Sequence, residues 1–111
     1  MVTGNGEILV LTTVANPEHA EIFARGLVDR KLAACVSCLP GVTSFYHWQD
    51  EGITRDTELI LLIKTHRDRL YEIERYFEDE HPYELPEFLV FDVAVLSKGY
   101  RDWIQTELSA K

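Results

Sequence analysis

The chain has 111 residues, of which 46% are hydrophobic and 27% are charged. This length and composition are typical of one globular domain, and they exclude a disordered, collagenous or disulfide-packed protein. Eleven Lys and Arg residues against 19 Asp and Glu residues give a formal net charge of −8, which disfavours nucleic acid and anionic membrane surfaces as partners.

The sequence predicts a cytoplasmic protein. Its apolar runs are far shorter than the roughly 18 residues of a membrane helix, and its N-terminus lacks the basic and apolar regions of a signal peptide. Its two cysteines, Cys35 and Cys38, fit a reducing compartment. Residues 1–6 are expected to be frayed, at the start of a single domain that spans residues 1–111.

The first half of the chain predicts a strand, a helix and a second strand. Residues 8–14 form a dense run of apolar and β-branched side chains, as in a strand. The Asn-Pro-Glu sequence at residues 16–18 suits a helix start, and apolar residues at helical spacing extend that helix to about residue 30. Residues 32–39 and 42–48 then predict one long strand, with a bend or bulge at the Pro-Gly pair between them.

The second half predicts a strand, a helix, a strand and a terminal helix, after a polar hairpin loop over residues 49–56. The Thr-His-Arg-Asp sequence at residues 65–68 resembles a capping box and marks the start of the first of these helices. That helix stops at His81, because a proline disfavours helical geometry in the residue before it. The remaining bounds are residues 57–65 and 88–95 for the two strands and residues 100–108 for the terminal helix.

These elements predict an α+β fold, a ferredoxin-like βαββαβ antiparallel sheet with an additional C-terminal helix. Both main helices should cover one face of that sheet, so its strands should alternate apolar and polar residues. Residues 8–11, 59–63 and 88–91 are instead apolar at consecutive positions, so apolar side chains point to both faces. We therefore expect the helix-free face to be buried in a homo-oligomer, with cover by the terminal helix as the alternative.

Few residues in the sequence suggest chemistry on their own. Cys35 and Cys38 form a C-x-x-C, but within a strand they point to opposite faces, so a shared redox or zinc site is disfavoured and a single thiolate ligand stays open. His81 is either a cation stabilised by a helix C-terminus or a ligand or acid–base group. Lys64 is either a solvated strand-end charge or a cation positioned in a cleft. Nucleophile and nucleotide-binding motifs are absent, so we expect no catalytic residues and no enzyme.

Several stretches of the chain, in the same order, resemble the CutA divalent-cation-tolerance family. The most specific are Leu-Ala-Ala-Cys at residues 32–35 and His-Pro-Tyr-Glu-Leu-Pro-Glu at residues 81–87, and the resemblance covers residues 8–108. It implies a PII-like homotrimer of ferredoxin-like subunits that is associated with copper and other divalent cations. Departures from the family pattern are a longer loop at residues 48–52, and Asp92 and Leu96 in place of a usual Pro and Gly.

The resemblance also implies which residues surround clefts between the subunits. Cys35, His81 and Glu84 are the metal-ligand candidates, and the expected cofactor is a divalent cation, with Cu²⁺ ranked first and Zn²⁺ second. The other cleft residues expected to bind a ligand are Tyr46, Trp48, Lys64, Tyr83, Glu87 and Trp103.

Three functions follow as hypotheses. The first is a non-enzymatic homotrimer that binds copper or another divalent metal ion and takes part in metal-ion tolerance. The second is a PII-like signalling or scaffold trimer whose clefts bind a small anion, through Lys64, or an unidentified partner protein. The third is an acylphosphatase-like enzyme, which is disfavoured because the turn after the first strand offers neither a phosphate-cradling loop nor a positioned arginine.

Overall fold

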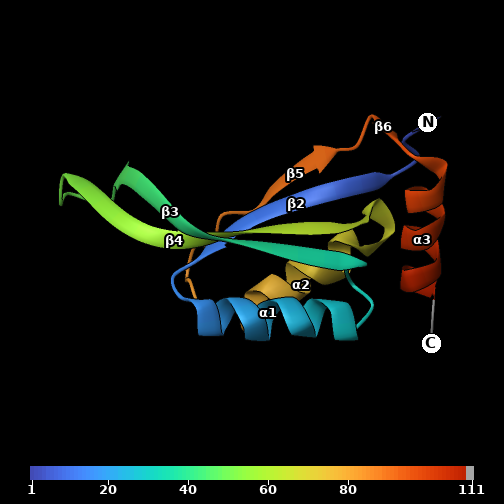
Figure 1. Cartoon of the computed structure of the whole chain (residues 1–111). Coiled ribbons are helices and arrows are strands. Elements are labelled where there is room, and N and C mark those ends of the chain that lie inside the picture. Colours follow the sequence, from blue (N-terminus) through green and yellow to red (C-terminus); the bar gives the residue numbers. More distant parts are fainter. Residues whose placement is uncertain (110–111) are drawn as a thin grey trace.

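The computed structural model describes residues 1–109, and its main strands and helices follow each other in the predicted order (Figure 1). No helix within these residues is long and apolar enough to span a membrane. The elements are β1 (Val2–Thr3), β2 (Glu7–Val14), α1 (Pro17–Asp29), β3 (Cys35–His47), β4 (Ile53–His66), a 3-10 turn (Arg67–Arg69), α2 (Leu70–Glu80), β5 (Leu89–Asp92), β6 (Val95–Leu96) and α3 (Lys98–Ser109).

The main sheet is antiparallel and has the strand order β3-β4-β2-β5. Figure 1 shows α1 and α2 together on one side of this sheet, α3 standing at one end, and the β3–β4 hairpin reaching beyond the other end. The predicted α+β class with an antiparallel sheet and a C-terminal helix is therefore confirmed.

The hydrophobic core lies between the sheet and the pair of helices α1 and α2. Alternate residues of β2 and β4 point into it, because side chains along a strand alternate between the two faces. Burial of each large apolar side chain contributes about 1.5–3 kcal/mol to folding. The buried residues are Ile8, Val10 and Val14 of β2, Leu59, Leu61 and Ile63 of β4, Phe23 and Leu27 of α1, and Ile73 and Phe77 of α2.

The opposite face of the sheet, which we call the open face, carries a second set of apolar side chains. Leu9 and Leu11 of β2 are paired with Lys64 and Leu62 of β4, and all four are only partly buried. On the edge strand, Phe91 is about half exposed. Within residues 1–109, α3 stands at the end of the sheet and does not cover this face (Figure 1).

Two predicted boundaries in the first third of the chain are wrong. Residues 1–6 are not a frayed lead-in, since Val2 and Thr3 pair with Leu96 and Val95 of β6. The long strand begins at Cys35 and not at residue 32, because the amides of residues 32 and 33 still bond to the carbonyl of Leu27 as α1 ends.

The hairpin loop is shorter than predicted, because polar residues there continue the strands. β4 begins at Ile53, and Thr54 and Asp56 pair with Tyr46 and Ser44 of β3. This part of the hairpin extends beyond the rest of the sheet, where most of its side chains are exposed to solvent and can therefore be polar. The predicted bulge at the Pro-Gly pair is confirmed by a register shift between residues 39 and 42.

The remaining differences concern helix starts and the last strands. Thr65 does not cap α2: it is buried in β4, and its hydroxyl donates to the carbonyl oxygen of Leu32 (2.6 Å). His66 caps the 3-10 turn that precedes α2, accepting a bond from the amide of Asp68 (3.1 Å), and Arg69 at the N-cap of α2 makes no side-chain cap bond. The single strand predicted over residues 88–95 is split into β5 and β6, which pair with different strands.

Candidate functional site

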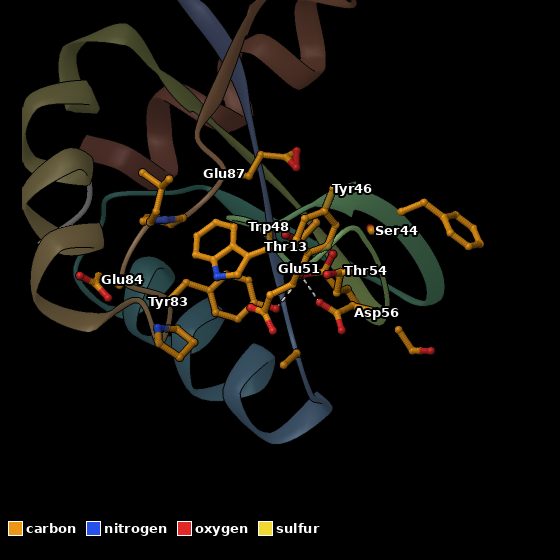
Figure 2. Close-up of a pocket in the computed structure, with 17 residues that line it drawn as sticks. Thr13, Ser44, Tyr46, Trp48, Glu51, Thr54, Asp56, Tyr83, Glu84 and Glu87 are labelled. Atoms are coloured by element: carbon orange, nitrogen blue, oxygen red, sulfur yellow. Dashed lines mark hydrogen bonds between the residues drawn. The ribbon is translucent and has the colours of Figure 1, made fainter.

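A pocket of about 1190 Å³ lies between the β3–β4 hairpin and the segment that joins α2 to β5 (Figure 2). We call it the hairpin pocket. Residues 44–58 of the hairpin form one wall, residues 82–87 form the other, and Thr13 and Ala15 contribute from the end of β2. Prolines 82 and 86 stiffen the second wall, because a proline ring restricts its own backbone and that of the residue before it.

The hairpin pocket is strongly acidic. Glu51, Asp56 and Glu58 line it from the hairpin, and Glu84 and Glu87 line it from the opposite wall. Its described lining includes no Lys, Arg or His side chain. Five carboxylates without a compensating cation create a negative potential that favours a bound cation and opposes an anion.

Three aromatic side chains stand among these carboxylates. Figure 2 shows the rings of Tyr46, Trp48 and Tyr83 near the centre of the pocket. The rings of Tyr46 and Trp48 meet edge to face with centroids 6.4 Å apart. The Tyr46 hydroxyl donates to Asp56, and the Tyr83 hydroxyl donates to Glu58 Oε2 (2.7 Å).

Both phenols are kept protonated by their surroundings. The hydrogen bond to Asp56 raises the pKa of Tyr46, and burial followed by the bond to Glu58 raises the pKa of Tyr83. Each hydroxyl therefore remains a donor that orients a carboxylate, and neither is poised to ionise as a nucleophile or base. The arrangement offers oriented oxygen ligands to a cation.

His81 anchors the wall formed by residues 82–87. Its Nδ1 accepts a bond from the amide of Tyr83 (3.0 Å), so Nε2 carries the proton and donates to Thr12 Oγ1 (3.0 Å). The ring packs against Phe23 and Phe77, and burial lowers the pKa of His81. Of the two sequence hypotheses, a dipole-stabilised cation does not fit, since the ring is neutral and both nitrogens are engaged.

Cys35 and Lys64 lie together at a different part of the sheet. Lys64 Nζ is 3.6 Å from Cys35 Sγ and also donates to the Ser37 hydroxyl. Lys64 is six positions from Glu58 along β4, which is on the order of 20 Å in an extended strand. Lys64 is thus outside the hairpin pocket.

The structure does not bring the three metal-ligand candidates together. Cys35 is paired with Lys64, which is paired with Leu9, so Cys35 lies on the open face. His81 bonds to Thr12 of β2. Because Thr12 is three residues from Leu9, it points to the opposite face of the sheet, toward the helices. Glu84 alone lines the hairpin pocket. Among residues 1–109, no three His, Cys, Asp or Glu side chains are grouped so that they could hold a metal ion.

The cleft residues expected from the sequence divide in a similar way. Tyr46, Trp48, Tyr83 and Glu87 all line the hairpin pocket. Trp103 lies on α3, stacked on Tyr100 with ring centroids 5.5 Å apart, at the end of the sheet away from the hairpin (Figure 1).

Sequence reasoning missed the carboxylates on the hairpin side, Glu51, Asp56 and Glu58. Residues 49–56 are mostly polar and predict a loop, in which side chains have no common direction, whereas Glu58 falls in the strand predicted over residues 57–65 with no sign of the pocket it lines. The alternation of Thr54, Asp56 and Glu58 at every second position is the signal that would have placed them on one face of a strand.

Comparison with known proteins relates almost the whole chain to one group. The family model described as CutA1 divalent ion tolerance protein matches residues 8–107. The divalent-cation tolerance protein CutA of Thermus thermophilus is 39% identical over 99 residues, which are 89% of this chain and 95% of that protein. The solved structure of CutA from Synechococcus elongatus has a TM-score of 0.93 and 38% identity, covering 97% of this chain and 95% of its own. The solved structure of CutA from Xylella fastidiosa has a TM-score of 0.90 and 38% identity, covering 95% of this chain and 100% of its own.

Proposed function

Since the chain belongs to the CutA1 divalent ion tolerance family, we propose that it is a non-enzymatic cytoplasmic protein that binds divalent cations in its hairpin pocket. The observation that carries this proposal is the composition of the pocket wall. Five carboxylates line it, and no Lys, Arg or His among the described lining residues opposes a positive charge.

The ligands available in the pocket are oxygens. Asp56 and Glu58 are each oriented by a tyrosine hydroxyl, and Glu84 and Glu87 line the other wall. Divalent first-row metals follow the Irving–Williams order at such sites, so Cu²⁺ should bind more tightly than Zn²⁺. Because no three of these groups are already grouped as a metal site, side chains such as Glu84 must turn inward, and we expect modest affinity.

We further propose that the chain forms a PII-like homotrimer of ferredoxin-like subunits. The support is the open face, where Leu9, Leu11 and Leu62 leave partly exposed apolar surface beside Phe91. Contiguous apolar surface of this kind is typical of contacts between chains, and identical chains associate by closed symmetry. The alternative of a PII-like anion sensor is less favoured, because Lys64 is held by Ser37 outside the acidic pocket.

The metal proposal is tested by titrating the metal-free protein with Cu²⁺ and with Zn²⁺ against a competing chelator. The double variant Asp56→Asn/Glu87→Gln removes two pocket charges, and we expect it to weaken Cu²⁺ binding tenfold or more, which is about 1.4 kcal/mol. The matched control is Glu78→Gln/Asp79→Asn, which removes two exposed charges from α2.

The control should leave the affinity within twofold of the unmodified protein. Equal weakening by both double variants would mean that only net charge matters, and the pocket would not be the site. Loss of binding in Cys35→Ser, with the pocket variant unaffected, would place the metal on the open face instead.

A further inference from the structure

The hairpin pocket is much larger than a bare metal ion requires. At about 1190 Å³ it is slightly larger than the roughly 300–1,000 Å³ of pockets that hold small organic molecules. Its carboxylates are spread over two walls and do not form a compact group of ligands. The pocket therefore has room for a cation that is long as well as charged.

Glu58 gives independent evidence that a cation belongs there. This residue is only 7% exposed and lines the pocket, yet no Lys, Arg or His within residues 1–109 forms an ion pair with it. Its Oε2 accepts from the Tyr83 hydroxyl, and Oε1, which is not among the buried polar atoms left without a partner, stays open to a further donor in the pocket. A mostly buried carboxylate without a counter-charge favours a nearby cation, so Glu58 can accept from a positively charged donor supplied by a ligand.

The aromatic side chains determine what kind of cation fits. Tyr46 and Trp48 meet edge to face, and Tyr83 is held beside Glu58 by its hydroxyl. Aromatic faces attract alkylammonium groups and also pack against the methylene groups that join them. A strongly hydrated metal ion would gain nothing from these rings.

The carboxylates are placed for more than one ammonium group. Glu51, Asp56 and Glu58 belong to the hairpin wall, whereas Glu84 and Glu87 belong to the opposite wall, and Figure 2 shows these two towards the edge of the pocket. We propose that the hairpin pocket binds a linear aliphatic polyamine, with one ammonium group at Glu58 and Asp56, methylene groups across the aromatic rings, and a second ammonium group at Glu84 or Glu87. This inference rests on the pocket being the cation site proposed above.

The experiment is isothermal titration of the metal-free full chain with spermidine at low ionic strength. Spermidine should bind saturably and at least tenfold more tightly than n-butylamine, which carries a single ammonium group. Trp48→Ala should weaken spermidine binding fivefold or more, because the ring packs against the methylene groups of the organic cation. Trp48 is 42% exposed, so its removal should not disturb folding.

The matched control is Trp103→Ala, since this second tryptophan is 41% exposed and lies on α3 outside the pocket. Equal effects of the two tryptophan variants on spermidine, or no preference for spermidine over n-butylamine, would overturn the inference. If Cu²⁺ binding still depends on Asp56 and Glu87 in that case, the proposed metal function stands without it. If Cu²⁺ binding is also independent of these residues, both proposals fail.

Discussion

At the scale of single residues, His81 connects the hydrophobic core to the pocket wall. Its Nε2 bonds to buried Thr12, while its Nδ1 holds the amide of Tyr83, whose hydroxyl in turn orients Glu58. Only the neutral ring makes both bonds, since a protonated Nδ1 has no lone pair to accept from an amide. The position of Tyr83 therefore depends on the protonation state of a residue behind it.

This dependence predicts how stability varies with pH. Burial lowers the pKa of His81 below the roughly 6.5 of an unfolded histidine, so the folded state binds the proton less well than the unfolded state. The contribution of His81 is complete above about pH 6.5 and is lost as the pH falls through the lowered folded pKa. Between pH 7 and pH 5, the free energy of unfolding should decrease less in His81→Gln than in the unmodified protein.

The measurement is urea unfolding at fixed protein concentration at both pH values. His47→Gln is the control, because His47 is exposed near the end of the hairpin, and it should keep the full decrease. A decrease in His81→Gln as large as that of the unmodified protein would contradict the assignment of a neutral buried ring.

At the scale of elements, the β3–β4 hairpin builds most of the pocket. Its strands remain paired for several residues beyond the rest of the sheet, and a register shift between Leu39 and Val42 interrupts them. Such a bulge adds twist and bends a strand, which redirects the residues beyond it. Tyr46 and Asp56 lie on that outer part, so the bulge determines where this wall of the pocket stands.

The bulge contains Gly41 at φ +76°, a backbone conformation that residues with a Cβ rarely adopt. A Cβ at this position would meet no atom within 4 Å, so Gly41→Ala tests backbone strain alone. We expect it to lower the free energy of unfolding by about 1–2 kcal/mol, measured by urea or thermal unfolding. Gly99→Ala, in α3 and also in open space, should be neutral or stabilising by up to about 1 kcal/mol. Equal effects of the two changes would count against strain at Gly41.

At the scale of the whole molecule, the sheet has two unlike faces. One is covered by α1 and α2, and the other leaves apolar side chains partly exposed over β2, β4 and β5. Chains that each carry a net charge of −8 repel one another. Contact between apolar side chains is therefore what would hold identical chains together. The open face is where such contact is available.

Sedimentation equilibrium tests the assembly proposed for this face. The unmodified protein should have three times the mass of one chain, and Phe91→Glu should dissociate it, because Phe91 is 48% exposed on the open face and a charge there would be buried on association. Ile22→Glu is the control, since Ile22 is 63% exposed on α1 and should not affect the mass. A monomeric unmodified protein, or an unchanged mass in Phe91→Glu, would contradict the homotrimer.

The sequence by itself determined the order of the elements, the α+β class and the family, because helix caps, turns and apolar spacing are short-range signals. Through the family resemblance it also predicted Tyr46, Trp48, Tyr83, Glu84 and Glu87 as cleft or ligand residues, and all five line the hairpin pocket. Only the tertiary structure decided that the hairpin carboxylates join them and that Lys64 and Trp103 do not. Whether two side chains meet depends on strand register and face, and moving a strand by one residue would reverse that outcome. Cys35 and His81 illustrate this, since the backbone pairing of β2, β3 and β4 places them on opposite sides of one sheet.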